Sequence, residues 1–206
     1  MRAILHRSVS SWKVGRKMNY AAIKKCDIAN GEGIRVSLFV SGCRNRCKGC
    51  FQTETWDFNY GNPFNNTTAD EIFSAVENRS VRGLTILGGE PMEPENQKAL
   101  FPFLLEFKRC YPEKSIWLYT GFRYEELLGE GGERCYTEQT HDLLSLVDIL
   151  VDGRFVEEEK SLGLRFRGSK NQRIIDMNET RKTGKITIWS GCKDDRIYNT
   201  ENNNEG

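Results

Sequence analysis

Four short runs of apolar and β-branched residues recur along the chain, and a loop and a helix-like pattern follow each run. The runs cover residues 34–40, 83–87, 115–119 and 147–151. Strands of this kind are typical of a parallel sheet covered by helices, with right-handed crossovers. A closed eight-unit barrel takes about 250 residues, and this chain has only 206. We therefore predict an α/β fold, a partial (open) β/α barrel with a mostly parallel sheet.

The loops after these four runs hold the residues with distinctive chemistry. They are residues 43–50, 88–91, 120–121 and 152–153. Because the carboxyl ends of parallel strands share one edge of a sheet, we expect the four loops to meet there. Active sites of barrels and of open α/β sheets lie at that edge. The pattern therefore predicts one functional site built from these loops.

Three of the seven cysteines, Cys43, Cys47 and Cys50, fall within eight residues in a C-x3-C-x2-C pattern. Thiolate is a soft ligand that selects zinc, Cu(I) or an iron–sulfur cluster. A structural zinc site and a [4Fe–4S] cluster each ordinarily take four protein ligands. One coordination position is therefore left over. Either a distant residue fills it, or the site keeps it open for a substrate.

The same motif allows two readings without catalysis. In the first, the thiolates hold zinc in an interaction module. The fourth ligand is then one of the two histidines or another cysteine, namely Cys26, Cys110, Cys135 or Cys192. In the second, the chain is a simple electron-transfer iron–sulfur protein. Such proteins usually show a fourth cysteine at regular spacing, and they have no need of a glycine loop.

The sequence Gly-Gly-Glu-Pro at residues 88–91 follows the second run. Taken alone, it is a tight turn between a strand and a helix. Beside the cysteines it is better interpreted as a ligand loop, because Gly89 lets a backbone approach closely and Glu90 can accept a hydrogen bond from a ligand amine. Thr120 and Asp152 follow the next two runs, where packing needs no polar side chain. Each is a candidate ligand contact, although Asp152 also suits a simple turn.

Composition excludes several other classes. The chain carries 30 Lys plus Arg against 29 Asp plus Glu, which indicates neither a nucleic-acid binder nor a polybasic membrane protein. No apolar run approaches the roughly 20 residues of a membrane span. Residues 1–17 are basic and lack the apolar segment of a secretory signal. A cysteine-containing chain without such a signal is expected in the reducing cytoplasm.

The folded domain is expected to cover residues 18–192. Residues 1–17 are predicted to be a disordered extension, and the polar residues 193–206 a disordered tail. Before the tail, residues 172–176 and 185–189 are predicted to be strands around a turn at Gly184. Thr67 or Thr68 is predicted to cap the first helix, and Pro94 to lie in the first turn of the second.

The charged residues between the cysteines, Arg44, Arg46 and Lys48, have three readings. They form an ordinary solvated face, offset the negative charge of a thiolate-bound cluster, or meet a partner protein. The charged residues 157–160, Glu-Glu-Glu-Lys, are expected to form a solvated face.

These motifs together resemble the radical S-adenosylmethionine superfamily, in which C-x3-C-x2-C follows the first strand and Gly-Gly-Glu-Pro the second. Within it, the chain looks like the activating enzymes of anaerobic (class III) ribonucleotide reductases. The closer resemblance lies between residues 18 and 176, in segments 27–35, 38–43, 117–121, 151–155 and 167–172. It implies the radical-SAM type of partial barrel.

The resemblance also implies cofactors, a reaction and partners. Cys43, Cys47 and Cys50 would bind three irons of a [4Fe–4S] cluster, and S-adenosylmethionine would take the fourth iron. Reductive cleavage would give methionine and a 5′-deoxyadenosyl radical, which takes a hydrogen from a glycine in the large subunit of the anaerobic reductase. A flavodoxin or a ferredoxin would supply the electron. The cofactor carries the difficult chemistry, and the protein positions it.

Motif position and resemblance together give the candidate cofactor-binding residues. They are Gly49, Cys50, Phe51, Gly88, Gly89, Glu90, Thr120 and Asp152. Many superfamily members carry an aromatic residue just before the third cysteine, whereas this chain has Gly49 there, as the activase subgroup does. The adenine contact therefore stays open. Two other enzyme readings also stay open, an activase of another glycyl-radical enzyme and a small-molecule radical enzyme.

Overall fold

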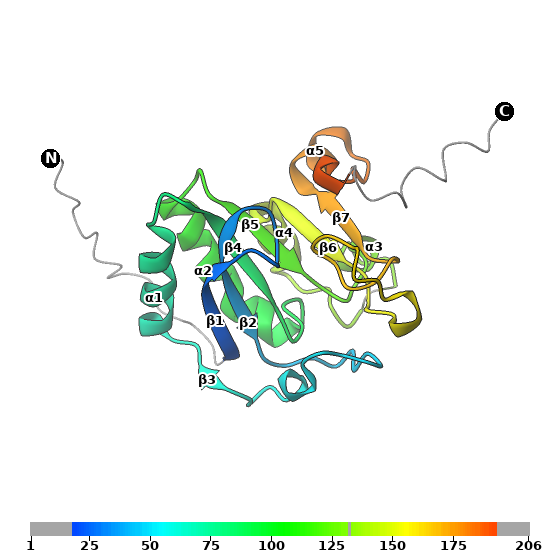
Figure 1. Cartoon of the computed structure of the whole chain (residues 1–206), viewed down its shortest axis with the longest axis horizontal. Coiled ribbons are helices and arrows are strands. Elements are labelled where there is room, and N and C mark those ends of the chain that lie inside the picture. Colours follow the sequence, from blue (N-terminus) through cyan, green and yellow to red (C-terminus); the bar gives the residue numbers. More distant parts are fainter. Residues whose placement is uncertain (1–17, 132, 193–206) are drawn as a thin grey trace, which may run out of the picture.

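The computed structural model describes residues 18–131 and 133–192 (Figure 1). The predictions for residues 1–17 and 193–206 therefore lie outside the described residues. Seven strands form one sheet in the order β3-β1-β2-β4-β5-β6-β7. The strands are β1 (Asn19–Asp27), β2 (Ile34–Val40), β3 (Asn62–Pro63), β4 (Val81–Gly88), β5 (Ser115–Tyr119), β6 (Ile149–Asp152) and β7 (Arg173–Asp176).

The four central strands β2, β4, β5 and β6 run parallel to one another, as predicted. Antiparallel strands flank them, with β1 and β3 on one side and β7 on the other. The sheet does not close, because β3 and β7 are its two ends. The prediction of an α/β fold with an open sheet is confirmed.

Strand β1 was not predicted, because its sequence lacks a β-branched run and exposes Lys24 and Lys25. A turn through residues 28–33 joins it to β2. Asp27 fixes this turn by accepting hydrogen bonds from the Ala29 backbone N–H (2.9 Å) and the Asn30 side chain (2.7 Å). The chain therefore adds an antiparallel edge strand before the parallel units begin.

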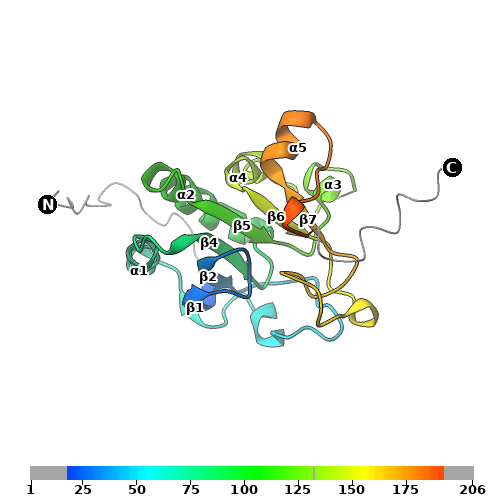
Figure 2. The ribbon, with the colours of Figure 1, turned by 45° about the horizontal axis from the view of Figure 1, so that its top comes forward.

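Helices cover one face of the sheet (Figure 2). The α-helices are α1 (Asn66–Val76), α2 (Pro94–Cys110), α3 (Tyr124–Leu127), α4 (Thr140–Leu146) and α5 (Met177–Thr183), and the 3-10 helices are η1 (Thr53–Trp56), η2 (Glu157–Glu159) and η3 (Ser190–Cys192). Pro94 begins α2 as predicted. The predicted cap at Thr67 or Thr68 was wrong, because the Asn65 side chain caps α1 by accepting the Thr68 N–H. Within the described residues, no helix is both long and apolar enough to cross a membrane.

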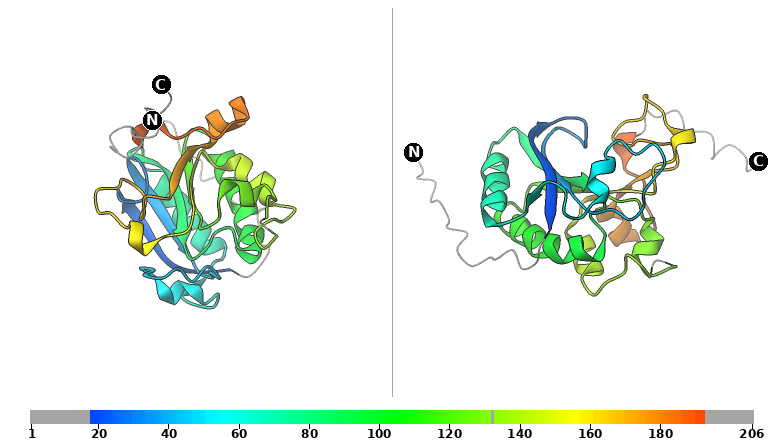
Figure 3. Two further views of the ribbon diagram at one scale, coloured as in Figure 1. Left: turned by 90° about the vertical axis from the view of Figure 1, so that its right-hand side faces the viewer. Right: turned by 90° about the horizontal axis from the view of Figure 1, so that it is seen from below.

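Strand register decides which side chains face the helices and which face the site. Leu38, Ile86 and Leu118 lie side by side on β2, β4 and β5. All three are buried in the core under the helices, together with Phe103 of α2. Because successive strand residues point to opposite faces, the next residues along each strand lie on the other face. Figure 3 shows that face free of the long helices.

A smaller cluster fills part of this second face. Trp117 of β5 packs against Phe166 and Trp189, with ring centroids 5.4 and 5.1 Å away. Trp189 lies in the segment predicted as a strand at residues 185–189. That prediction was wrong, because the segment makes only one β-bridge, between Ile188 and Ile175. Gly184 instead ends the unpredicted helix α5 in a left-handed conformation, with a φ of 69°.

Arg35, near the beginning of β2, lies on this second face of the sheet beside Trp117. Its side chain is buried, with 1% exposed, although no carboxylate of the described residues is bonded to it. The guanidinium donates to Thr85 Oγ1 (2.6 Å), to the Leu84 carbonyl (2.8 Å) and to the Ser115 carbonyl (2.9 Å). Burial lowers the pKa of Arg35 to about 10, so the group stays charged at neutral pH. Hydrogen bonds from this one cation therefore join three neighbouring parallel strands.

We expect Arg35→Met to lower the free energy of unfolding by about 3 kcal/mol, because hydrogen bonds to a buried charge are lost and two carbonyls lose a donor. Denaturant titration measures this change. The exposed Arg79→Met is the control and should change stability by under about 0.5 kcal/mol. Equal stability of the two variants would show that Arg35 does not support the sheet.

Candidate functional site

A cavity of about 400 Å³ lies at the carboxyl ends of the parallel strands, where the four loops were expected to meet. Most of the predicted site residues line it. They are Cys43, Cys47, Cys50, Phe51, Gly88, Gly89, Glu90 and Thr120. The four loops therefore meet at this edge, as expected.

The cysteine loop (residues 41–52) leaves β2 and crosses the end of the sheet. Backbone hydrogen bonds hold its beginning against η1. Gly42 N–H donates to the Thr55 carbonyl at 2.8 Å, and Cys43 N–H donates to the Trp56 carbonyl at 3.2 Å. Cys43 is buried as a result, while Cys47 and Cys50 are half-buried further along. The first cysteine is therefore the most firmly placed of the three.

Burial keeps two of the thiols protonated in the absence of a metal. It raises the pKa of Cys43 to about 11. Burial also raises the pKa of Cys47 above its ordinary value. Because only thiolates bind metal, binding to this loop must release protons.

The donor set suits an iron–sulfur cluster better than a single ion. Within the described residues, no three His, Cys, Asp or Glu side chains converge closely enough to hold one metal ion. The three motif thiols nonetheless line the same cavity, and Cys26, Cys110 and Cys135 do not line it. In a [4Fe–4S] cluster each thiolate binds a different iron, so the thiols need not converge on one point.

The glycine loop (residues 88–91) packs directly on the cysteine loop. Gly89 N–H donates to the Val40 carbonyl at 2.7 Å, and Glu90 N–H donates to the Gly42 carbonyl at 2.9 Å. A Cβ on Gly89 would lie only 2.7 Å from that Gly42 oxygen. Glycine is therefore required at position 89 by close backbone packing inside the protein.

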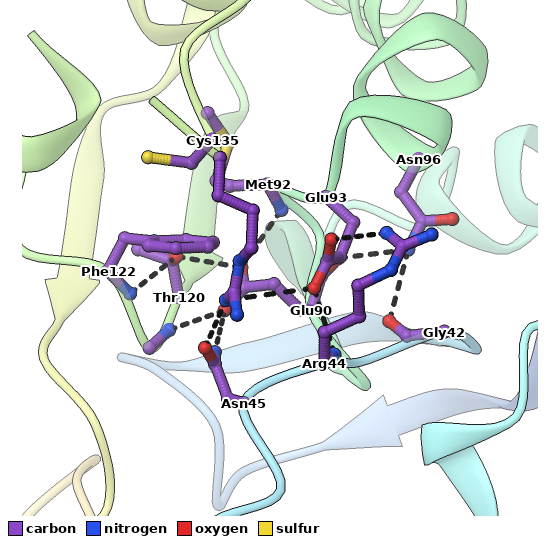
Figure 4. A network of polar contacts seen from close by, with 12 residues as sticks. Gly42, Arg44, Asn45, Glu90, Met92, Glu93, Asn96, Thr120, Phe122 and Cys135 are labelled. Atoms are coloured by element: carbon purple, nitrogen blue, oxygen red, sulfur yellow. Dashed lines mark hydrogen bonds and ion pairs between the residues drawn. The ribbon is translucent and has the colours of Figure 1, made fainter. Parts of the chain in front are cut away.

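Glu90 lies at the centre of a polar network and is fully buried (Figure 4). One carboxylate oxygen accepts hydrogen bonds from Thr120 Oγ1 (2.7 Å) and the Met92 N–H (2.9 Å). The other accepts from the Gly121 N–H (2.7 Å) and the Asn45 side chain (2.8 Å). The carboxylate thus connects the cysteine loop, the glycine loop and the end of β5.

Sequence reasoning missed Glu93, a second buried carboxylate in this network. It accepts the Arg44 backbone N–H at 2.9 Å and the Arg44 guanidinium at 2.6 Å. Glu95 binds the same guanidinium at 2.6 Å. The only available signal was an acidic pair around Pro94, which is typical of an ordinary helix start. Arg44 therefore anchors the cysteine loop to the beginning of α2.

Two predicted residues lie away from the cavity. Asp152 is buried, but it accepts hydrogen bonds from the Arg173 guanidinium and from the Tyr124 N–H (2.8 Å) and does not line the cavity. Its neighbour Gly153 lines the cavity instead. Gly49 does not line the cavity either, and a Cβ there would lie 2.8 Å from Glu157 Oε1.

An aromatic pair forms part of the cavity wall. Phe51 is 72% exposed, and its ring lies 5.7 Å from that of Phe155. Lys160 lies 4.6 Å above the Phe51 ring. Beside this pair, Lys48 forms an ion pair with Glu157 at 3.1 Å. The loop after β6 therefore packs against the cysteine loop (Figure 3). Glu157, Glu158 and Lys160 are exposed, as expected of a solvated face.

Comparison with known proteins agrees with this geometry. A family model described as a 4Fe-4S single cluster domain matches residues 29–175. The chain is 38% identical over 159 residues to an anaerobic ribonucleoside-triphosphate reductase-activating protein of Haemophilus influenzae, an overlap covering 76% of this chain and 97% of that protein. It is 36% identical over 159 residues to the protein of that name from Enterobacteria phage T4, an overlap covering 76% of this chain and 93% of that protein. It is 34% identical over 157 residues to the protein of that name from Escherichia coli strain K12, an overlap covering 75% of this chain and 96% of that protein.

The chain belongs to the family of anaerobic ribonucleoside-triphosphate reductase-activating proteins. The segment that matches the 4Fe-4S model contains all three motif cysteines and the whole glycine loop. Membership of this family supports the interpretation of the three thiols as ligands of a 4Fe-4S cluster, and it counts against a zinc-binding interaction module.

The titration of Glu90 predicts a pH dependence of stability. Burial raises its pKa from 4.5 to about 7, against the opposing effect of the hydrogen bonds it accepts. Between these values the folded state holds a proton that the unfolded state has released. The free energy of unfolding therefore falls as pH rises through this window, by about 1.4 kcal/mol per pH unit from this group.

Denaturant titrations of the wild type and Glu90→Gln at several pH values between 4.5 and 7 check this prediction. The difference in stability between the two proteins should change across the window and become constant above it. A difference that is independent of pH would place the pKa of Glu90 outside this range.

Proposed function

We propose that this chain is a radical S-adenosylmethionine enzyme that installs a glycyl radical on an anaerobic ribonucleotide reductase, and that its open sheet is a partial barrel of the radical-SAM type. One observation carries the proposal. Three thiols line a single cavity in a chain of the activase family, and no other cysteine or histidine whose side chain the structure describes lines it. The free coordination position is then the place for S-adenosylmethionine.

Cys43, Cys47 and Cys50 are the residues that would hold the [4Fe–4S] cluster. When bound, the cluster and S-adenosylmethionine supply the 5′-deoxyadenosyl radical that takes a hydrogen atom from a glycine of the reductase. The protein contributes position and shielding. Apolar side chains on the open face, Phe39 and Leu87, line the cavity and help to exclude water from it.

The glycine loop suits the amino end of S-adenosylmethionine. The N–H groups of Gly89 and Glu90 are already donated to carbonyls of the protein. The backbone groups that remain for a ligand in this loop are therefore acceptors, which match an ammonium group better than a carboxylate. Thr120 lines the same part of the cavity, and its hydroxyl is held by Glu90.

The partners follow from the same reaction. An open sheet leaves one side of the cavity accessible to a loop of the reductase, and the exposed Phe51 lies on that side. A flavodoxin or a ferredoxin would deliver the electron. Because the thiols must stay reduced to bind iron, the enzyme is proposed to work in the cytoplasm, without nucleic acid or membrane as a partner.

Anaerobic reconstitution with iron and sulfide tests the reaction. The reconstituted chain, reduced in the presence of S-adenosylmethionine and the reductase large subunit, should yield 5′-deoxyadenosine and a glycyl radical seen by electron paramagnetic resonance. Cys47→Ala should lose the cluster and both products. Cys26→Ala, which removes an exposed cysteine of β1 outside the cavity, should behave as the wild type.

Other results would redirect or end the proposal. Formation of 5′-deoxyadenosine without a glycyl radical would indicate another glycyl-radical protein or a small molecule as substrate. Folding restored by zinc alone, without any 5′-deoxyadenosine, would exclude the enzyme.

Gly89→Ala tests the glycine loop. The added methyl group meets the Gly42 carbonyl at 2.7 Å, so the glycine and cysteine loops must move apart. S-adenosylmethionine should bind at least about tenfold more weakly at equal iron content, measured by equilibrium dialysis. Gly163→Ala, whose methyl group would approach nothing closer than 3.9 Å, is the matched control. Unchanged affinity in Gly89→Ala would remove the loop from the binding site.

A further inference from the structure

Asn45, between the first two motif cysteines, is held at both ends of its side-chain amide (Figure 4). Its Nδ2 donates to Glu90 at 2.8 Å. Its Oδ1 accepts a hydrogen bond from the Arg134 guanidinium. One end thus faces an acceptor and the other a donor, so the amide has a single favourable orientation. Asn45 also lines the cavity.

Arg134 comes from the connection between α3 and α4, far from the cysteines in sequence. Its guanidinium lies 4.5 Å above the Phe122 ring and 3.8 Å from the buried carboxylate of Glu93. Its side chain is 37% exposed, yet its Nε is buried without a hydrogen-bond partner. A buried donor without a partner is costly. The guanidinium faces the network and donates a hydrogen bond to Asn45.

The network holds the cysteine loop at two successive residues. Arg44 is held by Glu93, and Asn45 is held by Glu90 and Arg134. The next residue, Arg46, is exposed and has a φ of 47°, so the backbone changes direction there. The positions of residues 44 and 45 therefore determine where the chain turns toward Cys47.

We propose that Arg134 is a positioning residue for the cysteine loop and acts through the side chain of Asn45. Arg134 does not line the cavity. Its effect reaches the site because Asn45 transmits it to the backbone between Cys43 and Cys47. The effect of Arg134 on the cluster rests on the proposed function, whereas its effect on the position of the cysteine loop does not.

Hydrogen exchange of the full-length chain without metal tests this placement. Arg134→Met keeps an apolar stem over Phe122 and removes the guanidinium. Backbone amides of residues 44–50 should exchange about tenfold faster than in the wild type, as follows when local opening becomes about 1.4 kcal/mol easier. Amides of the central strands should be unchanged. Arg109→Met, which removes an exposed arginine paired with Glu106 on α2, is the control.

A double variant separates positioning from simple packing. If Arg134 acts through Asn45, Arg134→Met should add little to the effect of Asn45→Ala on exchange of residues 44–50. Additive effects, or wild-type exchange in Arg134→Met, would overturn the proposal. If Arg134→Met loosens the whole sheet, Arg134→Lys, which keeps the charge and the stem, is measured in its place. Loosening of the whole sheet in that variant too would also overturn the proposal.

The protein with the cluster and S-adenosylmethionine bound gives an independent measurement of the role of Arg134. At equal iron content, the paramagnetic resonance spectrum of the reduced cluster with S-adenosylmethionine should differ between Arg134→Met and the wild type, and it should be the same in Arg109→Met. An identical spectrum in Arg134→Met would show that the loop position does not reach the cluster. If the wild type itself takes up no cluster or S-adenosylmethionine, the proposed function fails, while the exchange data still decide the role of Arg134.

Discussion

The buried carboxylate of Glu90 is the interaction on which the rest of the site depends. It accepts hydrogen bonds from three segments that are far apart in sequence, through Asn45, Met92, Thr120 and Gly121. Each donor would otherwise be an unsatisfied polar group near a cavity, so together they outweigh much of the cost of burying the carboxyl group. This one side chain connects the cysteine loop, the glycine loop and the end of β5, and the backbone hydrogen bonds between the two loops add to it.

The parallel strands make this arrangement possible. Strand register puts Leu38, Ile86 and Leu118 on the helix face, so that residues one position later, such as Phe39 and Leu87, face the cavity. The same register brings the carboxyl ends of all four strands to one edge. An open sheet then leaves that edge accessible, which suits a macromolecular substrate of the kind proposed.

Sequence patterns predicted the fold class, the four central strands and the site edge, because apolar periodicity and cysteine spacing are local signals. They were less informative where a residue's partner lies elsewhere. Asp152 looked like a ligand contact, yet its carboxylate is paired with Arg173, which comes from an antiparallel strand that returns beside β6. Glu93 carried only the signal of an ordinary helix start, and Arg134 carried none. The helix α5 did carry one, since Asp176 and Gly184 are ordinary cap residues at its two ends.

By itself the sequence determined that three thiolates and a glycine loop follow successive parallel strands, and hence that they share one edge of a sheet. That outcome needs only chain direction and the period of a strand. The tertiary structure alone decided how the loops are held. Glu90 and Glu93 are buried between segments, and hydrogen bonds satisfy them only after Arg44, Asn45 and Thr120 have been brought together by folding. Which polar groups find each other in a core depends on packing of the whole chain, and no local pattern records it.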